Sequence, residues 1–170
     1  MENIILIGMP GAGKSTVGVV LAKILGYQFV DSDLVIQQSE GKLLYELITS
    51  FGIDGFLDIE ERVNASIHVS HSIIATGGSV IYGQKAMEHF HKEGIICYLE
   101  LPYEPLEKRL GDLTKRGVTL KKNQDLKALY EERIPYYEKY ADITIECDNK
   151  QIREIAEEIA YKYESLKKRN

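Results

Sequence analysis

Residues 4–16 of this chain, IILIGMPGAGKST, decide its fold. The first four are apolar and mostly β-branched, which is typical of a strand buried on both faces. The segment from Gly8 to Ser15 then matches the pattern G-x-x-x-x-G-K-[ST]. After it, the spacing of Val17, Leu21 and Ile24 predicts a helix with these three residues on one side, which ends at Gly26. A strand, a glycine-rich loop and a helix in this order indicate a loop that holds phosphate groups.

The chemistry of this loop follows from its residue types. Its glycines let backbone N–H groups turn towards a β-phosphate, and the start of the next helix adds the positive end of its dipole. We expect Lys14 to reach the β- and γ-phosphates and the Ser15 hydroxyl to hold Mg²⁺. The dinucleotide pattern G-x-G-x-x-G does not fit, because Lys14 and Ser15 follow the last glycine. A GTPase is not favoured either, since the nearest match to its N-K-x-D motif ends in Ile152.

The rest of the chain alternates short apolar runs with helical patterns. Further strands are predicted at Gln28–Val30, Ser72–Ala75, Ile95–Leu99 and Ile143–Cys147. Further helices are predicted at Leu34–Glu40, Leu43–Phe51, Phe56–His68, Lys85–Lys92, Glu104–Leu110, Leu126–Tyr140 and Ile152–Leu166. This alternation predicts an α/β fold of the three-layer P-loop NTPase type, with a five-stranded parallel sheet covered by helices on both faces.

The length of 170 residues suits a single domain over 1–170, and two segments in it need more than a simple connection. Residues 33–69 are longer than one crossover requires, and we expect them to form a helical substrate-binding subdomain over the sheet edge. Residues 111–123 are polar and rich in Lys and Arg, and they are expected to form a lid. The alternative for this second segment is an ordinary exposed connection.

Composition narrows the class of protein. With 44% hydrophobic and 28% charged residues and a formal net charge of −5, the chain resembles a folded protein and lacks the basic excess of a nucleic-acid binder. No apolar run approaches the roughly eighteen residues of a membrane span, and the N-terminus does not resemble a signal peptide. Cys97 and Cys147 lie in strand-like segments, so we expect them to be reduced core residues of a cytoplasmic protein. We also expect a monomer.

Polar residues follow the second and third predicted strands. Asp31 and Asp33 bracket Ser32, so one carboxylate can orient water on Mg²⁺ while the other holds a hydroxyl and takes its proton. The alternative is that Asp33 only caps the helix that follows. Gly77 and Gly78 come after the third strand and allow a ligand to approach the backbone closely, or they form a tight turn.

These residues, in this order, resemble the shikimate kinase family of small P-loop kinases with the nucleoside-monophosphate-kinase fold. The likeness runs from Asn3 to about Ile159. It rests on the stretches LIGMPGAGKSTVGVVLAKILG (6–26), FVDSD (29–33), residues 56–60, ATGG (75–78), residues 98–99 and 108–110, and ERIPYYEKYAD (132–142). The phosphate loop alone indicates only a superfamily, whereas the acidic pair, the Gly-Gly turn and the R-x-P-x-Y pattern are far more specific.

The resemblance implies transfer of the γ-phosphoryl group of ATP to the 3-hydroxyl of shikimate, a step in aromatic amino acid biosynthesis. It implies that Asp33 holds the substrate hydroxyls and is the candidate base, and that Lys14 acts with it in catalysis. The remaining roles are also implied by the resemblance. On the nucleotide side, the phosphates are surrounded by Gly11, Ala12, Gly13, Lys14, Ser15 and Thr16, the metal lies by Ser15 and Asp31, and the adenine lies near Arg109. Arg116 reaches from the lid to the transferring phosphoryl group, while Gly77 and Gly78 line the substrate and Arg133 binds its carboxylate.

Three positions depart from the family pattern. The family motif F-R-x-x-E contains a carboxylate-binding arginine, and this chain has Leu57 at that position. Ser79 replaces a third glycine after Gly77 and Gly78, and Gly117 replaces the proline of the lid. Arg62 is five residues from position 57, about 140° around a helix, so we do not expect it to compensate. Glu60 is three residues from position 57 and shares its face.

The departure at Leu57 keeps a second substrate class open. If Glu60 faces the pocket without its usual cation, a carboxylate opposite Arg133 suits an acceptor that carries both an ammonium and a carboxylate group. A hydroxylated amino acid fits that description, and the other interpretation is that the pocket tolerates leucine. A nucleotide-binding module without catalysis is a third possibility, against which the intact Lys14, Asp33 and Arg116 argue.

Overall fold

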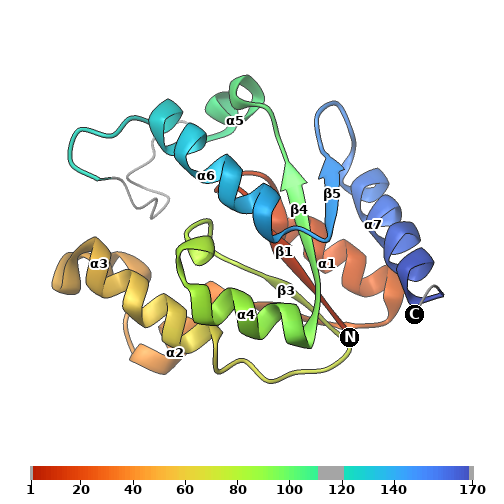
Figure 1. Cartoon of the computed structure of the whole chain (residues 1–170), viewed down its shortest axis with the longest axis horizontal. Coiled ribbons are helices and arrows are strands. Elements are labelled where there is room, and N and C mark those ends of the chain that lie inside the picture. The colour runs from red at the N-terminus through yellow and green to blue at the C-terminus, as the bar shows by residue number, and fades with distance from the viewer. Residues whose placement is uncertain (1, 111–120, 169–170) are drawn as a thin grey trace.

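The computed structural model describes residues 2–110 and 121–168. Five parallel strands form one sheet in the order β2-β3-β1-β4-β5 (Figure 1). They are β1 (Asn3–Ile7), β2 (Gln28–Asp31), β3 (Ser72–Ala75), β4 (Gly94–Glu100) and β5 (Ile143–Glu146). The predicted five-stranded parallel sheet is confirmed, with strand ends that differ from the predicted ones by no more than one residue. The apolar β1 is buried along its whole length, because it lies at the centre of the sheet between β3 and β4.

Helices cover both faces of this sheet. On one face, α1 (Lys14–Leu25) packs beside α7 (Ile152–Lys167), and on the other lie α4 (Gln84–Glu93) and α6 (Leu126–Tyr140) (Figure 1). The short α5 (Tyr103–Leu110) follows β4. In α1, Val17 and Leu21 are buried as expected, but Ile24 is exposed, so its predicted place on the buried side is wrong.

The segment after β2 folds into α2 (Ser32–Glu40) and α3 (Leu44–Asn64), with a small core of its own. The two helices predicted at Leu43–Phe51 and Phe56–His68 correspond to the two parts of α3, which a kink at Gly52 separates and which end at Asn64. The φ of 70° at Gly52 is in the left-handed region that glycine tolerates. Ile36, Leu47, Phe56 and Val63 form the core of this unit, apart from the main core. These two helices therefore stand beside the sheet and place one face of α3 near its carboxyl edge.

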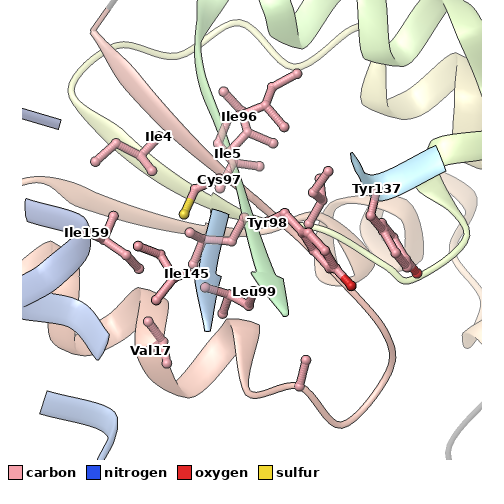
Figure 2. Packing of buried hydrophobic residues seen from close by; sticks show 14 of the residues in the cluster. Ile4, Ile5, Val17, Ile96, Cys97, Tyr98, Leu99, Tyr137, Ile145 and Ile159 are labelled. Carbon is pink, nitrogen blue, oxygen red and sulfur yellow. The ribbon is translucent and has the colours of Figure 1, made fainter. Parts of the chain in front are cut away.

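The main core fills the space between the sheet and its helices. Figure 2 shows side chains of β1 and β4, such as Ile5 and Tyr98, packed with those of α1, α7 and β5. Cys97 and Cys147 are buried free thiols, as expected, and burial raises the pKa of Cys147 to about 12. Among the described residues, no helix is long and apolar enough to cross a membrane.

Candidate active site

The phosphate loop lies between β1 and α1, at the carboxyl edge of the sheet. Gly11 (φ 81°) and Gly13 (φ 97°) adopt the left-handed backbone that turns the loop, and Ala12 is buried beneath it. The Lys14 side chain folds back over this loop. Its Nζ donates hydrogen bonds to the carbonyl oxygens of Gly8 (2.7 Å) and Met9 (2.9 Å). The ammonium group is thus held inside the loop. Its present partners are neutral carbonyl oxygens, which a bound phosphate group would replace.

The protonation of Lys14 is sensitive to this setting. Its residue is only 8% exposed, and burial lowers the pKa of the ammonium to about 8. The nearby carboxylates of Asp33 and Asp31 act against burial and raise the pKa. Lys14 therefore carries its charge at neutral pH and loses it in mildly alkaline solution.

Asp31 connects the acidic pair to the phosphate loop. Its Oδ2 accepts a hydrogen bond from the Ser15 hydroxyl (3.1 Å), and its Oδ1 accepts one from the backbone N–H of Asp33 (3.0 Å). Asp31 is thus the N-cap of α2, and the suggestion that Asp33 caps this helix is wrong because the helix already begins at Ser32. A hydroxyl beside a carboxylate is the kind of oxygen pair that Mg²⁺ prefers, so Ser15 and Asp31 fit the expected metal.

Asp33 faces the space in front of the loop. Burial and the neighbouring Asp31 carboxylate raise its pKa to about 6, while Lys14 acts in the opposite direction. A carboxyl group with a pKa near neutral pH is suited to accept a proton during a reaction and to release it afterwards.

The predicted phosphate and acidic residues surround one hollow of about 400 Å³, called the main hollow below. Its wall includes most of the predicted site: Gly11, Gly13, Lys14, Ser15, Thr16, Asp33, Glu60, Gly77 and Gly78. A Cβ atom on Gly77 would lie 2.7 Å from Oε1 of Glu60 and 3.0 Å from Oδ1 of Asp33. A side chain at this position would therefore force the Glu60 carboxylate to move and would crowd that of Asp33, so glycine preserves the arrangement of both.

Glu60 projects from α3 into the same region. It is 2% exposed; its Oε2 accepts a hydrogen bond from the Ser79 hydroxyl (2.6 Å), and its Oε1 has no hydrogen-bond partner. Burial raises the pKa of Glu60 to about 7, while the Ser79 hydrogen bond lowers it. The replacement of a glycine by Ser79 thus gives Glu60 one neutral partner.

Arg133 and Leu57 line a second, smaller cavity of about 180 Å³, called the side cavity below. Arg133 projects from α6, is 1% exposed, and lies with its guanidinium carbon 5.5 Å from the centre of the Tyr82 ring. Its Nη1 would be 2.9 Å from a Cβ atom on Gly78, which also lines the main hollow. The two spaces therefore adjoin at Gly78 and Arg133, and the predicted substrate-binding residues are divided between them.

Arg62 does not take the place of the missing arginine, as expected. It is exposed and pairs with Glu40 of α2 (2.7 Å). Arg109 is exposed on α5 and lies outside both cavities, although Leu110 beside it lies close to Gly11 of the phosphate loop. Arg116 and residues 111–120 of the expected lid are outside the described residues.

One group of possible metal-ligand side chains lies outside the predicted site. His68, His89 and Glu93 offer ligand atoms within 4.8 Å of one another. His89 and Glu93 are four residues apart on α4, a spacing that sequence alone could have flagged. This group is remote in sequence from the phosphate loop and lines neither the main hollow nor the side cavity.

Three tyrosines without an assigned role also lie in or beside the site. Tyr82 donates a hydrogen bond to Glu132 (2.5 Å), and Tyr137 donates one to the carbonyl oxygen of Gly78 (2.6 Å). Tyr137 also stacks on Tyr98, whose ring lies beside it in Figure 2. Tyr137 is the last residue of the R-x-P-x-Y pattern, which was its sequence signal, whereas Tyr82 belongs to no motif and was missed.

Comparison with known proteins gives consistent matches along nearly the whole chain. A family model described as shikimate kinase matches residues 10–164. A shikimate kinase of Thermodesulfovibrio yellowstonii is 38% identical over 169 residues, which cover 98% of this chain and 97% of the relative. One of Clostridium botulinum (strain 657 / Type Ba4) is 41% identical over 143 residues, covering 82% and 84%.

A solved structure agrees with these matches. The shikimate kinase from Acinetobacter baumannii in complex with shikimate superimposes with a TM-score of 0.88 at 33% identity, covering 98% of this chain and 95% of that one. These comparisons agree with the fold, the phosphate loop, the acidic pair and the Gly-Gly turn. The chain belongs to the shikimate kinase family.

Proposed function

We propose that this protein transfers the γ-phosphoryl group of ATP to a hydroxyl group of a small carboxylate, with shikimate as acceptor and shikimate 3-phosphate as product. One observation carries the proposal: the buried Lys14 ammonium of a phosphate loop shares a hollow with the Asp33 carboxyl group. A cation for phosphates and a base for a hydroxyl are the two groups that phosphoryl transfer to an alcohol requires. Membership of the family supports both ATP and shikimate as ligands.

The roles proposed for the phosphate loop and for Asp33 are supported by their positions, whereas those of Arg109, Arg116 and Arg133 rest on the family resemblance. Backbone N–H groups of Gly11–Thr16 and the Lys14 ammonium bind the phosphates, while Ser15 and Asp31 would hold Mg²⁺, which neutralises phosphate charge. Asp33 orients the acceptor hydroxyl and takes its proton as the oxygen attacks the γ-phosphorus and ADP leaves. Arg133 binds the acceptor carboxylate. Arg109 beside the adenine and Arg116 on the transferring phosphoryl group complete the proposal.

Glu60 favours a second candidate. Its buried Oε1 without a hydrogen-bond partner suits an ammonium group, which would make a hydroxylated amino acid the acceptor. Against this, burial holds the pKa of Glu60 near 7, so a large share of the molecules present a neutral carboxyl group there at neutral pH. A neutral group attracts a cation weakly, and shikimate therefore remains the first choice.

The test is an ADP-release assay coupled to NADH oxidation, with shikimate, quinate, gluconate, homoserine, serine and threonine as acceptors. We expect shikimate to give the highest kcat/KM and phosphate to appear on its 3-hydroxyl. A higher kcat/KM for homoserine, serine or threonine would establish the second candidate. ADP release that no acceptor increases would indicate a nucleotide-binding module.

We also propose that the protein acts in the cytoplasm, as a single domain in which residues 33–69 bind the acceptor and 111–123 form the lid. Two buried thiols suit a reducing compartment. The monomeric state stays a prediction, which sedimentation equilibrium would measure.

A further inference from the structure

The side cavity contains a second cation besides Arg133. Lys121 lines it from the turn that precedes α6, facing a wall that includes Leu57 of α3. We propose that Lys121 supplies the second positive charge for the acceptor carboxylate, in the place left by the leucine at position 57. This inference rests on the proposed function, because it requires an acceptor with a carboxylate.

Lys121 is held at the cavity wall by a network of hydrogen bonds. Its Nζ lies 2.9 Å from Oε1 of Glu132, whose Oε2 accepts from the Tyr82 hydroxyl (2.5 Å) and from Gln124 (3.4 Å). These donors lower the pKa of Glu132 to about 2, so the carboxylate keeps its charge and keeps hold of Lys121 across the physiological pH range. An ammonium has three N–H donors, and one bond to Glu132 leaves two for a ligand.

The surroundings of the cavity suit an anion. Arg133 is buried beside the Tyr82 ring, and the apolar Leu57, Ile53 and Leu129 in the same cavity strengthen its attraction for a negative charge. The Lys121 side chain is 65% exposed, so water partly screens its attraction. Two carboxylates also line the cavity. Glu132 is already bound by its three donors, and Asp54 is exposed, where water screens it.

The position of the cavity relative to Asp33 suits a single acceptor that occupies both spaces. Gly78 borders the main hollow, and the Arg133 guanidinium approaches the point where Gly78 lacks a side chain. An acceptor whose hydroxyl lies at Asp33 would thus extend past Gly78 and place its carboxylate at Arg133. Lys121 is the second cation that lines this cavity.

The experiment compares Lys121→Met with wild type, using shikimate and its methyl ester, which lacks the negative charge. We expect KM for shikimate to rise about five- to tenfold, the loss of one partly screened charged hydrogen bond. The KM values for the methyl ester and for ATP should not change. The matched control is Lys127→Met, an exposed lysine of α6 that lies outside the proposed lid and lines neither space.

A double variant provides a second test. If the two positions serve the same carboxylate, Leu57→Arg should restore shikimate affinity to Lys121→Met, measured by calorimetric titration without turnover. An unchanged KM for shikimate in Lys121→Met, or an equal loss for shikimate and its methyl ester, would overturn the inference and leave the proposed function intact. Wild-type protein that phosphorylates no carboxylate acceptor would overturn both.

Discussion

The main hollow and the side cavity differ in how they are built. The phosphate end of the main hollow comes from one continuous segment, whose glycines and backbone N–H groups leave little freedom in residue choice. The side cavity is formed by side chains of α3, of η1 (Val80–Tyr82) and of α6 with the turn before it. Side chains on separate elements can be exchanged one at a time, and the departure at Leu57 lies in this cavity, whereas that at Ser79 lies in the wall of the main hollow.

The largest effect is expected at the phosphate end. Lys14→Ala removes a buried charge that is oriented before the reaction, so kcat should fall on the order of 10²- to 10³-fold while the fold remains intact. The measurement is acceptor-dependent ADP release, with circular dichroism to monitor folding. Lys23→Ala, an exposed lysine in the last turn of the same helix, is the control. A folded Lys14→Ala protein with near-normal turnover would contradict the phosphate-loop assignment.

Asp33 connects the phosphate end to the acceptor. Asp33→Asn keeps its shape and removes its charge, and turnover should fall about 10²-fold or more if Asp33 is the base. ATP affinity, measured by titration, should change little. Asp58→Asn on the exposed side of α3 is the matched control. A variant that binds ATP poorly but turns over normally would place Asp33 on the nucleotide side.

A substitution at position 57 tests whether the side cavity binds the acceptor carboxylate. Leu57→Arg should lower KM for shikimate up to about tenfold, because a guanidinium facing Arg133 adds a charge-assisted hydrogen bond to the carboxylate. For an amino-acid acceptor the same cation would repel the ammonium group and raise KM. Leu34→Arg, on the exposed surface of α2, controls for added charge. No change with any acceptor would mean that the carboxylate does not lie in the side cavity.

The smallest effect is the pH dependence. Asp33 has a raised pKa of about 6 and must be ionised to accept a proton, so kcat/KM for the acceptor should fall about tenfold as the pH falls from 7 to 5. The pKa of Lys14 is lowered to about 8, so this residue loses its charge as the pH rises above 8 and ATP binding should weaken. Rates measured at saturating ATP report the titration of Asp33, and separate ATP titrations report that of Lys14.

Glu60 is the other group in the main hollow that titrates near neutral pH. Glu60→Gln should keep the fall in kcat/KM at low pH with little shift, because Glu60, with its pKa raised to about 7, is already mostly neutral where Asp33 titrates. Loss of that fall in this variant would assign the pH dependence to Glu60.

Sequence reasoning was strongest for elements with a local cause. The apolar run of β1 predicted the central strand, and Gly8–Ser15 predicted the loop. Sequence reasoning was weaker for features that depend on packing between elements far apart in the sequence. Ile24 fits a helical face by its spacing, yet it is exposed. The interruption at Gly52, in contrast, agrees with the two helices predicted at Leu43–Phe51 and Phe56–His68, which leave residues 52–55 between them.

The site divides in the same way. Sequence by itself determined the phosphate loop, the acidic pair and the Gly-Gly turn, because each is a short motif whose residues act through their own backbone or at adjacent positions. Only the tertiary structure decided that Asp31 caps α2, that Oε1 of the buried Glu60 has no hydrogen-bond partner, and that Lys121 lines a cavity with Arg133. The side cavity joins residues as far apart in sequence as Leu57 and Arg133, 76 positions, and no periodicity records which distant side chains the packing of α3 and of α6 against η1 brings together.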